Sequence, residues 1–157
     1  MSIVHLHLLL GHVPVVGILF ALLLFAAAIF LRESVSTRFA LGFSAALAAV
    51  AITVYFTGGA AEEAVEKLAG VAEGAIEQHE EAAEVTTIAL SIFGALSLAA
   101  LVIFRKVRMP RWVGATGFAG TVVLSALMGW TANLGGQIRH TEIRSANFQQ
   151  GGSAAED

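Results

Sequence analysis

The chain has 157 residues, of which 57% are hydrophobic and 13% are charged, and it contains no cysteine. This composition is too apolar for an ordinary soluble domain, and the missing cysteine excludes disulfides, thiolate metal sites and haem attached through cysteines. A net charge of −3, without any long run of basic residues, gives no reason to expect nucleic acid as a partner.

Four long apolar stretches follow one another along the chain. Each has close to the roughly 20 residues that an α-helix needs to cross about 30 Å of hydrocarbon. Backbone groups in lipid must be satisfied inside helices or closed barrels, and the alternation typical of barrel strands is absent from these stretches. The sequence therefore predicts an all-α integral membrane protein, an antiparallel four-helix transmembrane bundle. The predicted spans are residues 13–31, 39–57, 85–104 and 112–133.

The segment between the second and third spans, residues 58–84, is rich in alanine and glutamate. Both are strong helix formers, so we expect the second and third helices to extend beyond the membrane as a hairpin that turns near Gly70. Residues 1–146 then form one domain. The tail, residues 147–157, is small and polar, and we expect it to be disordered unless a partner orders it.

The loop charges predict the orientation of the bundle. Six of the nine basic residues flank the two short loops, between the first and second spans and between the third and fourth. Basic residues concentrate on the cytoplasmic side of membrane proteins. We therefore expect a multi-pass protein of the bacterial inner membrane, with both termini on the periplasmic or extracellular side. Trp112 and Trp130, near opposite ends of the fourth span, are typical of interfacial anchors.

All five histidines lie at the non-cytoplasmic end in this topology. At about 1.5 Å per helical residue, His7, His79 and His140 lie roughly 9–10 Å above the predicted hydrophobic edge, near the height of Glu62 and Glu63. His12 lies at the edge itself. Intramembrane ionisable residues usually mark functional sites.

Helical spacing adds a prediction about faces. His5 and His12 are seven residues apart and share one face of the first helix, whereas His7 points largely elsewhere. On the third helix a stripe of mostly small residues accompanies the histidine, and we expect it to face the interior. This stripe is His79, Ala82, Ala83, Thr86 and Leu90.

Three short motifs give the chain a resemblance to a known family. They are "HLLLGHVP" at the head of the first span, "TGGAAEE" at the end of the second and "LGGQIRH" after the fourth. Together they resemble a family of small four-span predicted bacterial membrane proteins of unknown function, some of them fused to Rieske iron–sulfur domains. The resemblance implies a redox setting. The chain departs from the family pattern at Arg139 and His140, where an aromatic residue is more usual.

The first functional hypothesis is a haem b protein that transfers electrons. Haem iron accepts two neutral imidazoles from facing helices. The first and third helices of an up-down bundle are diagonal, so His7 or His12 opposite His79 is the predicted ligand pair. His140 is then a partner of a haem propionate or a ligand of a second haem, and Arg139 is a partner of a propionate.

The second hypothesis is a non-haem site for Fe, Cu or Zn, since imidazoles and carboxylates from facing helices commonly build such centres. The third is an accessory or scaffold subunit without a cofactor. No phosphate-binding loop or nucleophile elbow indicates a catalytic activity. The expected partners are the lipid bilayer, a redox protein such as a Rieske or cytochrome protein, and a second copy of the chain. The candidate ligands of the non-haem metal are His7, His12, His79, His140, Glu62 and Glu63.

Overall fold

The computed structural model describes residues 3–32, 34–66 and 73–140, and within them the chain forms four long α-helices. The predicted all-helical class is confirmed, and the described residues contain no strand. Gly70, at the predicted hairpin turn, and the tail 147–157 lie outside the described residues. The helices are α1 (Ile3–Leu31), α2 (Ser34–Glu66), α3 (Glu73–Ile103) and α4 (Arg111–Arg139).

Each of the four helices is long and apolar enough to cross a membrane. Two of them begin well before the predicted membrane spans: α1 begins at Ile3, before Val13, and α3 begins at Glu73, inside the segment into which a helical extension is predicted. The histidine of α3 and the first histidines of α1 therefore lie within regular helix. Their side chains have fixed directions, so the faces that they occupy can be compared between helices.

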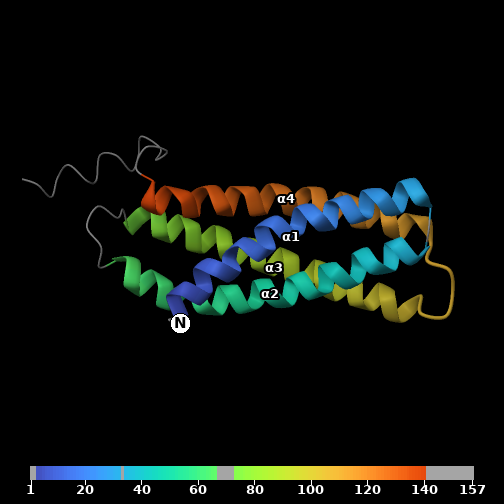
Figure 1. Cartoon of the computed structure of the whole chain (residues 1–157), viewed down its shortest axis with the longest axis horizontal. Helices are drawn as coiled ribbons and strands as arrows, with labels where there is room; N and C mark the ends of the chain where they lie inside the picture. Colours follow the sequence, from blue (N-terminus) through green and yellow to red (C-terminus); the bar gives the residue numbers. More distant parts are fainter. Residues whose placement is uncertain (1–2, 33, 67–72, 141–157) are drawn as a thin grey trace, which may run out of the picture.

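The helices pack in a ring. α1 and α3 each pack against both α2 and α4, so α1 and α3 lie diagonally opposite one another. Figure 1 shows the start of α1, the end of α2, the start of α3 and the end of α4 at one end of the molecule, with α1 slanting across the other helices. We call this the histidine end and the opposite one the arginine end.

The interior is built mainly from small and medium side chains, with Phe25 as an exception, while many large aromatic side chains face outward. Ala21 and Leu90 are fully buried in the central cluster, and Phe25 is fully buried nearer the arginine end. By contrast, Phe30 is 85% exposed and Phe56 is 78% exposed. Small residues inside and large apolar residues outside are typical of helices that pack together in lipid.

Hydrogen bonds near the arginine end join the start of α2 to the segment between α3 and α4. Arg38 lies near the start of α2 and donates two hydrogen bonds to backbone oxygens just beyond α3. One acceptor is Phe104, and the other is Val107 at 2.7 Å. The backbone N–H of Met109 donates to Ser34 Oγ at 2.9 Å. These bonds pair backbone groups between α3 and α4, where the Phe104 oxygen also accepts the Val107 N–H at 3.2 Å.

Candidate functional site

His79 in α3 is held by the backbone of α4. Its Nδ1 lies 3.0 Å from the carbonyl oxygen of Thr131. A carbonyl oxygen can only accept, so Nδ1 carries the proton and donates it. The ring lies against Gly135, where a Cβ atom would come within 3.0 Å of the ring Cε1. Glycine at this position therefore lets the imidazole lie close to the α4 backbone.

A hydrogen-bonded pair of threonines lies directly beside this anchor. The hydroxyl oxygens of Thr86 and Thr131 are 2.8 Å apart, and Thr131 Oγ1 also lies 3.1 Å from the carbonyl oxygen of Ala82. Thr86, Ala82 and Leu90 are buried and His79 is half-buried. The predicted interior stripe of α3 is confirmed at these positions.

His7 in α1 is held by α2 in the same manner. Its Nδ1 lies 3.1 Å from the carbonyl oxygen of Val54 and 3.1 Å from Thr57 Oγ1. Thr57 Oγ1 donates to the Val54 carbonyl at 2.8 Å, which leaves the hydroxyl oxygen able to accept the Nδ1 proton. The ring lies over Gly58, where a Cβ atom would stand 3.6 Å from Cε1.

The two anchors repeat one arrangement. In each, an imidazole bonds a carbonyl on the next helix and packs on the glycine one turn later, Val54 with Gly58 and Thr131 with Gly135. Protonation at Nδ1 leaves a lone pair on Nε2, and this nitrogen could therefore coordinate a metal. Among the described residues, the Nε2 atoms of His7 and His79 have no hydrogen-bond partner.

The two anchored histidines come from diagonal helices at the same end of the molecule. His7 and His79 come from α1 and α3, and they are close enough to interact electrostatically. Each is partly buried. The structure therefore brings together two imidazoles with the same tautomer, from diagonal helices at the same end of the molecule. Two neutral imidazoles from different helices are ligands that a haem iron can accept.

His12 and His5 occupy a different face of α1. Both are exposed, and His12 Nδ1 lies 2.7 Å from the carbonyl oxygen of Leu8 in its own helix. The prediction that His5 and His12 share a face, with His7 elsewhere, is confirmed. The structure brings His7, and not His12, to His79.

The remaining predicted site residues lie further toward the histidine end. Glu62 is half-buried and lies one turn beyond Gly58, and Glu63 is exposed. His140 is exposed, caps α4 and donates its backbone N–H to the Gly136 oxygen at 3.0 Å. The side chain of Arg139 lies outside the described residues.

These positions differ from the heights predicted along the chain. His7 is level with Gly58 rather than with Glu62, and His79 is level with Gly135 rather than with His140. The predicted heights hold only for parallel helices with aligned hydrophobic edges, whereas α1 is inclined to its neighbours (Figure 1). Within residues 3–32, 34–66 and 73–140, no group of three His, Cys, Asp or Glu side chains is placed to hold a metal ion.

Comparison with known proteins gives no match. No family model, no curated protein and no solved structure is significantly similar to the chain. The function is therefore inferred from the arrangement of His7 and His79.

Proposed function

We propose that this protein is a membrane electron-transfer protein that holds haem b between His7 and His79. The observation that supports the proposal is the matched anchoring of two diagonal imidazoles. Each donates Nδ1–H to a carbonyl of the neighbouring helix, at 3.1 Å for His7 and 3.0 Å for His79, and each packs on a glycine. A structural histidine needs one such anchor, but two similar anchors on diagonal helices at one end of the molecule favour a shared ligand.

The chemistry of the pair suits haem b. His7 and His79 would hold the haem iron through their Nε2 nitrogens, and the haem would supply one-electron transfer. The Nδ1–H bond to a carbonyl fixes the ring plane of each ligand and raises its basicity. Rigid anchoring on two helices would hold both rings in place while the charge of the iron changes.

The finer topology belongs to the same proposal. We place the four helices as antiparallel spans, with α2 and α3 extended beyond the bilayer and both termini periplasmic or extracellular. The concentration of six basic residues at the arginine end supports this orientation in the bacterial inner membrane. The histidine site would then lie at the non-cytoplasmic mouth of the bundle.

The electron partner would approach from the same side. Exposed carboxylates flank His79 along α3 and would attract a partner with a basic docking surface. We propose a soluble or tethered redox protein, such as a Rieske or cytochrome protein, as this partner. The exposed carboxylates are Glu77, Glu80, Glu81 and Glu84.

The test is a spectrum of the full-length protein purified in detergent and titrated with haemin. We expect a Soret band and sharp b-type bands in the reduced-minus-oxidised difference spectrum. His7→Ala and His79→Ala should each abolish the six-coordinate low-spin spectrum, because each removes an axial bond. His12→Ala and His5→Ala are matched controls on the same helix as His7 and should retain it.

A rescue experiment separates ligand loss from misfolding. His79→Gly should regain the low-spin bands when free imidazole is added, because the small molecule can occupy the vacated position. Retention of the full spectrum in both His7→Ala and His79→Ala would refute the site. A colourless parent protein with stoichiometric Fe, Cu or Zn by elemental analysis would favour a non-haem metal, and neither cofactor would favour a scaffold subunit.

A further inference from the structure

The arginine end carries a strong and unbalanced positive charge. It holds six basic residues and one acidic residue, Glu33, so its formal net charge is six minus one, or +5. The basic residues are Arg32, Arg38, Arg105, Lys106, Arg108 and Arg111. In a chain with a net charge of −3, this concentration favours interaction with anionic groups at this end.

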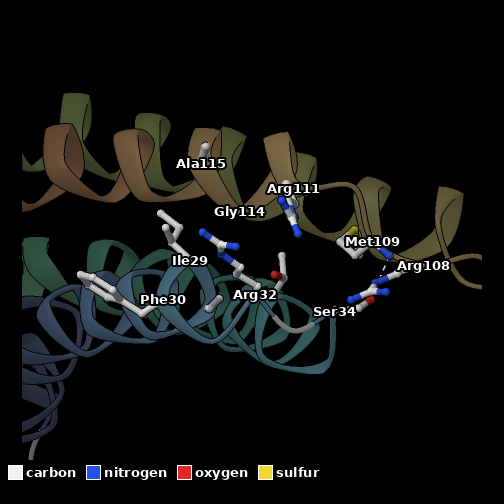
Figure 2. Close-up of a pocket in the computed structure, with 11 residues that line it drawn as sticks. Ile29, Phe30, Arg32, Ser34, Arg108, Met109, Arg111, Gly114 and Ala115 are labelled. Atoms are coloured by element: carbon white, nitrogen blue, oxygen red, sulfur yellow. Dashed lines mark hydrogen bonds between the residues drawn. The ribbon is translucent and has the colours of Figure 1, made fainter.

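Three of these arginines surround one cavity. The cavity has a volume of about 460 Å³ and lies between the end of α1 and the start of α4. Its lining includes Arg32, Arg108 and Arg111. Figure 2 shows the side chains of Arg32 and Arg111 entering the space from opposite walls, with Arg108 beside Ser34. Guanidinium groups that converge in this way can bind one anionic group through several charge-assisted hydrogen bonds.

The fold does not use these three guanidinium groups. Arg38 donates to two backbone carbonyls, whereas Arg32, Arg108 and Arg111 make no hydrogen bond or ion pair with any residue that the structure describes. All three are exposed. Their donors therefore remain available to a ligand.

The rest of the lining combines a hydroxyl with apolar side chains. Ser34 Oγ accepts the Met109 N–H, which leaves its own hydroxyl proton free to donate. Ile29 and Phe30 line the cavity beside the arginines and are 41% and 85% exposed on the outer surface of α1. A ligand with an anionic head and an apolar tail would match both parts of this lining.

Arg32 is held in an unfavourable backbone conformation. Its φ of 55° lies in the left-handed region, at the helix end where glycine is the usual residue. A glycine there would relieve the strain. Arginine instead directs a guanidinium into the cavity at some cost in backbone energy, which a purely structural role does not require.

We infer that this cavity is a binding site for the phosphate headgroup of an anionic phospholipid, with the acyl chains along Ile29 and Phe30. Basic pockets between membrane helices on the cytoplasmic side bind such headgroups. Trp112 follows Arg111, is 61% exposed and is typical of residues at the headgroup level. The inference rests on the membrane-spanning part of the proposed function and not on haem.

The test measures lipid binding by the full-length protein in detergent. Phosphatidylglycerol is titrated into the delipidated protein, and bound lipid is counted by native mass spectrometry, with zwitterionic phosphatidylcholine as the comparison of zero net charge. We expect saturable binding of phosphatidylglycerol, weakened about tenfold or more by Arg111→Gln, since a hydrogen bond to a charged group contributes about 1.5–3 kcal/mol. Lys106→Gln removes the same charge at the same end but does not line the cavity, and it should change affinity less than about twofold.

Arg32→Gly distinguishes a ligand role from a structural role. Without lipid, this variant should melt at the same temperature as the parent or higher, because glycine accepts the left-handed φ without strain. It should nevertheless bind phosphatidylglycerol about tenfold more weakly. A variant that melts lower and binds the lipid normally would show that Arg32 serves the fold, and would overturn the inference.

Two further outcomes would also overturn it. Equal binding of phosphatidylcholine, or equal losses in Lys106→Gln and Arg111→Gln, would show that no specific headgroup site exists. Displacement of the lipid by inorganic phosphate at similar concentration would assign the cavity to free phosphate. The haem spectrum of the same preparations reports on the histidine end, so failure of either proposal is recognised separately.

Discussion

Thr131 supports His79 through two of its atoms. Its carbonyl oxygen accepts the imidazole Nδ1 proton at 3.0 Å, while its hydroxyl lies 2.8 Å from the hydroxyl of Thr86. Thr86 and Ala82 are in the same helix as His79, and Thr131 Oγ1 also lies 3.1 Å from the Ala82 carbonyl oxygen, so three hydrogen bonds join α3 and α4 within two helical turns. The position of the imidazole is therefore coupled to a buried side-chain pair as well as to the backbone.

The first prediction concerns this threonine pair. Thr131→Val keeps the carbonyl and the side-chain shape but removes the hydroxyl, and we expect a loss of about 1 kcal/mol in the free energy of unfolding, in line with interhelical hydrogen bonds in membranes. The haem spectrum should persist because the carbonyl remains. Equilibrium unfolding in mixed micelles measures the change.

The double variant provides the control. Thr86→Val combined with Thr131→Val removes both partners, so no buried hydroxyl is left unpaired by the change, and the total loss should be smaller than the sum of the single losses. Strictly additive losses would show that the two hydroxyls do not stabilise one another.

The second prediction concerns the glycine beneath His79. In Gly135→Ala, the new Cβ would lie 3.0 Å from Cε1 of the ring, which is too close, so the imidazole must move. We expect haem affinity to fall sharply, measured by titration with haemin. Gly129→Ala on the same helix meets nothing within 4 Å, and Gly58→Ala places its Cβ 3.6 Å from His7, so both should retain the cofactor. Equal haem affinity in all three variants would contradict the role given to Gly135.

The parts of the fold that depend on local pattern could be predicted from the sequence. Four apolar stretches gave four helices because the length and hydrophobicity of a span are local properties. The face shared by His5 and His12, and the interior stripe from His79 to Leu90, followed from the 3.6-residue period. These predictions need no knowledge of neighbouring helices.

The choice between His7 and His12 could not be made in this way. This choice depends on the inclination of α1 and on the carbonyl acceptors in α2. Because every residue has a carbonyl group, the residue type of Val54 does not identify it as the acceptor. The only sequence features related to the two anchors were Gly58, which follows Thr57, and Gly135, four residues after Thr131. Side-chain spacing alone does not reveal that these glycines accommodate the imidazoles.

The third prediction concerns orientation. A reporter that works only in the periplasm should be active when it is fused after Asp157. A reporter that works only in the cytoplasm should be active when it is inserted in the loop 105–111. We expect this because six of the nine basic residues flank the two loops at the arginine end. Paired alkaline phosphatase and fluorescent-protein fusions measure this. The reverse pattern would place the histidine site on the cytoplasmic side.

The last prediction concerns Arg38, which has a structural role that the cavity arginines lack. Its guanidinium donates to the Phe104 and Val107 carbonyls, which the end of α3 leaves without helical partners. Arg38→Ala should lower the free energy of unfolding by about 1.5–3 kcal/mol, since it removes hydrogen bonds from a charged group. Arg38→Lys should lose less, because an ammonium group keeps the favourable charge near the helix C-terminus but lacks the planar fork of donors. Unfolding in detergent measures both, and Lys106→Gln is the control for charge. If Arg38→Ala and Lys106→Gln destabilise the protein equally, the effect comes from net charge at this end and not from the two hydrogen bonds.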